Sequence, residues 1–204
     1  MRTHWVIALK PEADAVIDRF GLKRIRNEQA GFPIWHSEET GHWLVLSGIG
    51  KANAAAATAW LQAVSGEPDE AVLWLNFGIA GHRNREIGSL IRAHKITDSA
   101  TGKSWFPPAV WDRKHDIESG ELLTVDLPTA DYPELELVDM EASGFLGTAT
   151  RFETAERVQV LKIVSDNVSG GGFEKVDAEK VRGWTSAVIP AVAEWHGEVA
   201  RKVS

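Results

Sequence analysis

The pattern of hydrophobic and polar positions switches repeatedly between the period of a strand and the period of a helix. Short, continuous apolar runs predict buried strands over residues 5–9, 43–47, 71–78 and 158–164. Apolar residues at helical spacing predict helices over residues 11–20, 51–64, 141–150 and 176–200. Pro190 is expected to bend the last of these helices.

Weaker patterns fill the intervals between these segments. They predict short, half-exposed strands or a hairpin over residues 24–27 and 33–37, and further strands over residues 87–97, 122–125 and 135–138. The segment 98–117 contains Pro107 and Pro108 and has little periodicity, so we expect a loop that covers a site. Residues 170–172, all glycine, are expected to form a flexible hinge or loop.

Strands that alternate with helices favour one arrangement of the whole chain. We expect an α/β fold with a central mixed, largely parallel β-sheet flanked by helices. The 204 residues are long enough to bury one sizeable core, and no linker or internal repeat divides them. A single domain over residues 1–204 is therefore the prediction.

Composition and charge narrow the classes of function. The net charge of −7 argues against a nucleic-acid backbone as the partner, although it leaves a nucleoside open. The absence of cysteine excludes disulfides and thiolate chemistry. The seven histidines show no paired spacing typical of metal ligands, so no metal site is expected. No signal peptide or long apolar span is visible, so we expect a cytoplasmic protein without a membrane partner.

A glycine turn joins the strand ending near Ser47 to an alanine-rich helix. Gly48, Ile49 and Gly50 form this turn, which directs backbone N–H groups and a helix N-terminus toward a possible anionic or hydroxyl-rich ligand. As a dinucleotide fingerprint the motif is weak, because Asn53 replaces the third glycine and the strand is not the first. A simple tight turn explains the glycines equally well.

A second group of small residues follows the most apolar strand. Gly78, Ala80 and Gly81 surround Ile79 at the carboxyl end of this strand, where a ligand can approach the backbone closely. A plain turn is the alternative interpretation.

Two acidic residues stand beside the ends of apolar strands. Glu141 lies between a strand and a helix, and Asp166 ends the strand over residues 158–164. Carboxylates in such positions lie on the ligand-binding edge of an α/β sheet, and burial there favours a protonated acid. Taken separately, each acid is also explained as a helix or turn cap.

Together, these segments occur in an order and spacing that resemble a known superfamily. Residues 7–12, 47–51, 76–81, 140–142 and 165–166 are similar to motifs of the nucleoside phosphorylases and nucleosidases, most closely of methylthioadenosine/S-adenosylhomocysteine nucleosidases. The resemblance implies a nucleoside phosphorylase-like fold and cleavage of the N-glycosidic bond of a purine nucleoside through a transition state like an oxocarbenium ion. It also implies that no cofactor is used, and that the chain forms a homo-oligomer, with a dimer favoured.

The resemblance assigns roles residue by residue. Asp166 matches the acid that protonates purine N7, and Ser165 precedes and orients it. Glu141 matches the residue that holds the ribose hydroxyls, and Met140 the residue that packs against the ribose. Glu12 matches the acid that positions or activates the attacking water.

Further substrate-binding residues follow from the same resemblance. They are Ile49, Gly78, Ile79, Ala80, Gly81 and Lys162. Two of them depart from the family pattern, because Lys162 stands where an arginine is frequent and Ile79 where a hydroxyl residue is frequent. The phenylalanine that stacks on adenine has no counterpart near residues 124–128, and the chain is short in its middle.

Other functions stay open beside hydrolysis. A phosphorylase of the same fold would need arginines for phosphate, and none matches near Gly48 or before Gly78, whereas Arg83 and Arg85 fit a solvated turn. The departures from the family pattern would also fit a non-catalytic nucleoside-binding protein, and the glycine turn a dinucleotide-dependent oxidoreductase. The sequence does not identify the base or the 5′ substituent.

Overall fold

The computed structural model describes residues 1–26, 31–66, 71–110 and 117–203. Its strands are β1 (Arg2–Ile7), β2 (Lys23–Ile25), β3 (Ile34–Ser37), β4 (His42–Leu46), β5 (Val72–Gly81), β6 (Leu90–Asp98), β7 (Ser104–Trp105), β8 (Glu118–Thr124), β9 (Glu136–Asp139) and β10 (Val158–Asp166). Its helices are α1 (Lys10–Arg19), α2 (Lys51–Ser65), α3 (Ala142–Ala149) and α4 (Ala178–Val203), with 3₁₀ turns η1 (Ala155–Arg157) and η2 (Phe173–Lys175). The strong apolar patterns therefore predicted strands and helices correctly, with ends displaced by a few residues.

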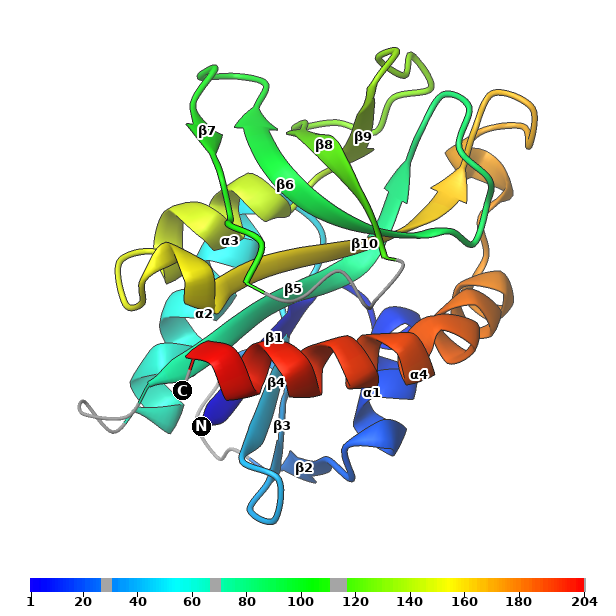
Figure 1. Cartoon of the computed structure of the whole chain (residues 1–204). Helices are drawn as coiled ribbons and strands as arrows, with labels where there is room; N and C mark the ends of the chain where they lie inside the picture. The colour runs from blue at the N-terminus through cyan, green and yellow to red at the C-terminus, as the bar shows by residue number, and fades with distance from the viewer. Residues whose placement is uncertain (27–30, 67–70, 111–116, 204) are drawn as a thin grey trace.

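The described strands form one mixed sheet (Figure 1). Its centre is parallel, in the order β4, β1, β5, β10, because these strands are buried on both faces and are joined through helices. The edge hairpin β2–β3 and the pair β3–β4 are antiparallel. The expected α/β fold with a mixed sheet is confirmed.

Part of the sheet closes on itself, which the sequence did not predict. β5 pairs with β10, β10 with β6, β6 with β8, β8 with β9, and β9 returns to β5. The last pairing is narrow, joining Gly81 of β5 to Val138 of β9. In Figure 1, β6, β8 and β9 curl away from the plane of β1 and β4. Closure brings the carboxyl ends of β5, β9 and β10 together.

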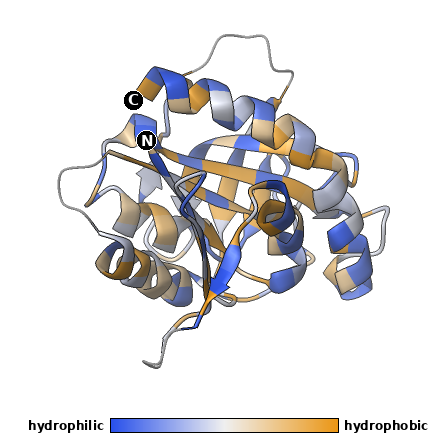
Figure 2. Ribbon diagram, turned by 90° about the horizontal axis from the view of Figure 1, so that it is seen from below, coloured by the Kyte–Doolittle hydropathy of each residue, from blue (hydrophilic) through white to orange (hydrophobic). Residues whose placement is uncertain are grey.

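Strand alternation divides the interior into two cores. Trp5 and Ile7 of β1 face α1 and α4, whereas Val6 between them faces α2 and α3. β5 divides in the same way, with Leu73 in the first core and Trp74 in the second. Figure 2 shows hydrophobic colour concentrated in the central strands, while the helices carry both hydrophobic and hydrophilic residues.

Three weaker expectations have different outcomes. In the segment 98–117, a loop was expected, but Ser104 and Trp105 form β7 against β6, and residues 111–116 lie outside the described part. The glycines 170–172 do form a turn, with positive φ of 90° at Gly171 and 75° at Gly172. Asn27, at the end of one expected strand, also lies outside the described residues.

Among the helices that are described, none is long and apolar enough to cross a membrane.

Candidate active site

A cavity of about 210 Å³ opens where the carboxyl ends of β5, β9 and β10 meet. Its wall includes nine residues that the sequence singled out, which are Glu12, Ile49, Ile79, Ala80, Gly81, Met140, Glu141, Ser165 and Asp166. Gly78 and Lys162 lie behind this wall. The cavity is also lined by Val125, Pro128, Thr129 and Tyr132, and by Phe173 and Val176, whereas no described residue of segment 98–117 reaches it. The expectation that segment 98–117 covers the site is therefore wrong for its described part, because pairing with β6 draws it away.

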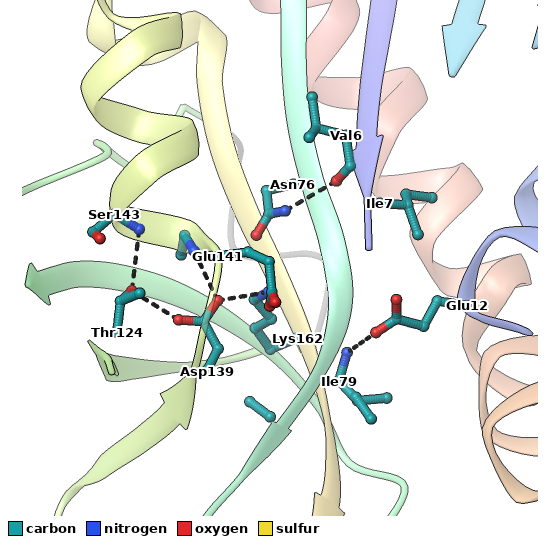
Figure 3. A network of polar contacts seen from close by, with 12 residues as sticks. Val6, Ile7, Glu12, Asn76, Ile79, Thr124, Asp139, Glu141, Ser143 and Lys162 are labelled. Carbon is teal, nitrogen blue, oxygen red and sulfur yellow. Dashed lines mark hydrogen bonds and ion pairs between the residues drawn. The ribbon is translucent and has the colours of Figure 1, made fainter. Parts of the chain in front are cut away.

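Glu12 is a buried carboxyl group held by backbone amides. It lies in the first turn of α1, where one of its oxygens accepts a hydrogen bond from the N–H group of Leu9 at 2.7 Å. The other accepts from the N–H group of Ile79 at 2.9 Å (Figure 3). A Cβ atom at Gly78 would lie 2.8 Å from a Glu12 oxygen, so glycine is needed there. Burial raises the pKa of Glu12 to about 7, although the two amides and Lys162 lower it.

Glu141 reaches the same cavity from the start of α3. The N–H group of Gly50 donates to one of its oxygens at 2.9 Å. Gly50 has a φ of 104°, a conformation that favours glycine, so the turn predicted from sequence positions this carboxyl group. Burial raises the pKa of Glu141, and Asp139 adds to the effect while Lys162 opposes it.

A buried ion pair supports this wall. The Nζ atom of Lys162 lies 2.8 Å from an oxygen of Asp139, and both side chains are fully buried. Asp139 also accepts hydrogen bonds from the N–H of Ala142 at 2.9 Å and the hydroxyl of Thr124 at 2.7 Å (Figure 3). Burial lowers the pKa of Lys162, but Asp139 and Glu141 outweigh it and leave the pKa above its ordinary value. Lys162, expected to bind substrate, thus holds Asp139.

Asp166 occupies the end of the cavity away from these groups. The Ser165 hydroxyl donates to one of its oxygens, and the Tyr132 hydroxyl donates to the other. A Cβ atom at Gly81 would lie 2.7 Å from Asp166 and 2.5 Å from the Tyr132 ring, so glycine is required for both to fit. Sequence reasoning missed Tyr132, whose signal was its status as the single tyrosine of the chain.

The arrangement combines four carboxyl groups with a largely apolar wall, and one of them, Asp139, is paired with Lys162. Asp166 is available as a partner for a heterocycle nitrogen, and Glu141 and Glu12 as acceptors for hydroxyl groups or water. Over the described residues, the cavity wall contains no arginine, lysine or histidine. No group of three or more metal-ligating side chains was found in the part of the chain that the structure describes.

Comparison with known proteins finds similarity in structure and not in sequence. No protein-family model matches the chain, and no curated protein matches its sequence. The Arabidopsis thaliana 5′-methylthioadenosine nucleosidase is 18% identical and has a TM-score of 0.76, covering 97% of this chain and 95% of its own.

Two ligand-bound structures are similar as well. The 5′-methylthioadenosine/S-adenosylhomocysteine nucleosidase of Colwellia psychrerythraea, solved with adenine, is 16% identical with a TM-score of 0.71 and covers 100% of this chain and 96% of its own. The Neisseria meningitidis enzyme, solved with methylthio-immucillin-A, is 20% identical with a TM-score of 0.66 and covers 98% and 99%. With its sheet, helices and nearly full mutual coverage, the chain has the nucleoside phosphorylase-like fold of the methylthioadenosine/S-adenosylhomocysteine nucleosidases.

Proposed function

We propose that this protein is a nucleosidase that hydrolyses the N-glycosidic bond of a purine nucleoside similar to methylthioadenosine. The observation that carries the proposal is the convergence of Asp166, Glu141 and Glu12 on one cavity at the carboxyl ends of the strands. The shared fold supports it, because solved proteins of that fold hold adenine or methylthio-immucillin-A.

Each carboxyl group has a separate task in this reaction. As the bond between C1′ and the base breaks, its electron pair moves onto the base. Asp166 donates a proton to N7, and the departing base becomes neutral. Glu141 accepts hydrogen bonds from the ribose hydroxyls, and its negative charge favours the cationic sugar. Glu12 takes a proton from the water whose oxygen bonds to C1′. Met140 and Ser165 are proposed to contact the ribose and to orient Asp166, respectively.

Water suits this cavity better than phosphate as the nucleophile. A phosphate ion requires cationic or N–H partners, and the described wall of the cavity supplies no basic side chain. Glu12 and Glu141 would repel the ion in their ionised forms. A Glu12 carboxyl group with a pKa of about 7 is suited to accept a proton from water near neutral pH.

The proposal is tested by measuring release of free base from methylthioadenosine, S-adenosylhomocysteine, adenosine and inosine, with and without phosphate. We expect release without phosphate from at least one of these nucleosides. The nearly isosteric Asp166→Asn variant should lose roughly 100-fold or more of the turnover while keeping its circular dichroism spectrum. Release that depends on phosphate would instead indicate a phosphorylase, and tight adenine binding without any cleavage a binding protein.

A further inference from the structure

Tyr132 has no task in the proposed reaction, yet it lines the cavity beside the proposed acid. It is the single tyrosine of the chain and is buried, with 5% of its surface exposed. It belongs to the connection between β8 and β9, residues 125–135, which forms neither helix nor strand. The side chain therefore places an irregular segment against the catalytic end of the cavity.

The contacts of Tyr132 join three parts of the molecule. Its hydroxyl group donates to Asp166 at the end of β10 and accepts from the backbone of Phe173 in η2. Its ring packs so closely on Gly81 of β5 that a Cβ atom there would lie 2.5 Å away. Burial and the hydrogen bond to Asp166 raise the pKa of Tyr132 well above its usual range, so the hydroxyl group keeps its proton at neutral pH. It therefore remains a donor.

Both carboxyl oxygens of Asp166 accept hydrogen bonds from hydroxyl groups. Ser165 holds one oxygen from the adjacent position in the same strand, where its hydroxyl also lies 3.3 Å from the carbonyl oxygen of Ala80. Tyr132 holds the other oxygen from across the cavity. A base nitrogen that takes a proton from Asp166 competes with these hydroxyl groups for one of the oxygens. Both hydroxyl-bearing residues line the cavity, but Ser165 is fixed in β10 beside Asp166, whereas Tyr132 belongs to the irregular segment.

The segment that carries Tyr132 is held to the rest of the protein at few points. Its first residues are held by the N–H of Val125, which donates to Asp139, and by the ion pair of Asp126 with Lys51. Leu127 and Leu135 are 77% and 74% exposed, so few apolar contacts hold them. Segments with little buried apolar surface and no ladder of backbone hydrogen bonds open at low cost in free energy. The buried hydroxyl group of Tyr132 is thus a main anchor of the segment.

We propose that Tyr132 is a displaceable latch, which holds residues 125–135 over Asp166 and yields its place on that carboxyl group to the nitrogen of a purine base. The identity of this ligand rests on the proposed function, whereas the contact between Tyr132 and Asp166 does not. A base that reaches Asp166 competes with the Tyr132 hydroxyl group for the same carboxyl oxygen.

The experiment compares wild-type protein with Tyr132→Phe, which keeps the ring and removes only the hydroxyl group. Leu127→Ala is the matched control, because it alters the same segment at an exposed side chain that does not line the cavity. We expect amide hydrogen exchange over residues 126–134 to be faster in unliganded Tyr132→Phe than in wild type. We also expect adenine to bind Tyr132→Phe about tenfold more tightly by calorimetry, because a hydrogen bond that competes for Asp166 is lost.

The outcomes separate this inference from the proposed function. Faster exchange and tighter adenine binding in Tyr132→Phe, with Leu127→Ala unchanged, support the latch. If wild type cleaves nucleosides and binds adenine but Tyr132→Phe binds it equally or more weakly, the latch is wrong and the proposed function stands. Unchanged exchange in Tyr132→Phe also overturns the latch. If neither protein binds adenine but wild type releases a base, the latch is wrong and the proposed function stands. If wild type neither binds adenine nor releases a base from any of the four nucleosides, both proposals fail.

Discussion

Glu12 illustrates how a single side chain acquires its chemistry from its surroundings. Two backbone N–H groups fix the positions of its oxygens, and burial raises its pKa to about 7. The ionised form, which accepts a proton from water, therefore becomes the major form only as the pH rises past this value.

We expect the rate of base release at low substrate concentration to rise with pH, with a midpoint of about 7 set by Glu12. The measurement is a profile of kcat/KM between pH 5 and 9. Glu12→Gln should lower the rate by roughly 100- to 10,000-fold and remove this limb of the profile. A Glu12→Gln variant that retains the same midpoint would assign the titration to another group.

At the residue scale, local context was sufficient to single out three acidic residues, and their roles stay predictions. Glu12, Glu141 and Asp166 each stand at the end of a recognisable strand or at the start of a helix, and the structure places all three on one cavity. Lys162 could not be placed in the same way, since its partner Asp139 lies on a different strand. Tyr132 was missed because the irregular segment that carries it shows no hydrophobic periodicity.

At the scale of elements, the contact between α2 and α3 sets the geometry of the Glu141 carboxyl group. A Cβ atom at Gly144 of α3 would overlap the carbonyl oxygen of Lys51 at the start of α2. The two helix backbones therefore touch beside the bond between Gly50 and Glu141. Any separation of these helices would also stretch that bond.

The variant Gly144→Ala is expected to separate α2 from α3 and lower the free energy of unfolding by about 1–3 kcal/mol through overpacking. It should also raise KM, because the Gly50 amide is drawn away from Glu141. Urea denaturation and nucleoside kinetics measure the two effects. Gly147→Ala is the control in the same helix, since its Cβ atom would meet Trp105 at an ordinary 3.4 Å, and it should be neutral or stabilising. Equal losses in both variants would indicate a general effect on α3.

The elements themselves were predictable where the hydrophobic period was strong, as in β5 and β10. The closure of the sheet was not, because the pairing of β9 with β5 involves residues far apart in the chain and only one pair, Gly81 with Val138. The described part of segment 98–117 was wrongly expected to cover the site for the same reason. Its pairing with β6 depends on the tertiary structure and leaves no local signal.

Across the described residues, four histidines are buried, His4, His42, His82 and His196, and burial lowers the pKa of each. Burial lowers the pKa values of His4 and His42 to about 3 and of His196 to about 4. His42 accepts a hydrogen bond from the Trp5 indole at 2.9 Å, and His196 lies 2.9 Å from the Thr3 hydroxyl. The unfolded chain binds protons on these rings below about pH 6.5, whereas the folded chain binds them only at a lower pH. The free energy of unfolding therefore decreases as the pH falls through this range.

We expect His196→Gln, which retains a partner for Thr3, to lose less stability in acid than wild type. The difference in unfolding free energy between the two proteins should change by up to about 1.4 kcal/mol per pH unit between roughly pH 6 and 4.5. Urea denaturation at several pH values gives this difference. The variant comparison is needed because Glu12, whose pKa is raised, stabilises the fold as the pH falls and opposes the histidines. Parallel stability curves for the two proteins would contradict the prediction.

The closed ring of strands also limits pairing with other chains through backbone hydrogen bonds. The ring runs through β5, β10, β6, β8 and β9. A closed ring presents no long unpaired strand edge to another chain. Of the described strands, β2 ends the other side of the sheet, and it is only three residues long, is exposed, and carries Lys23 and Arg24. Short, charged edges of this kind discourage amyloid-like stacking. The curvature that gathers the carboxyl groups proposed to be catalytic thus also guards the chain against aggregation.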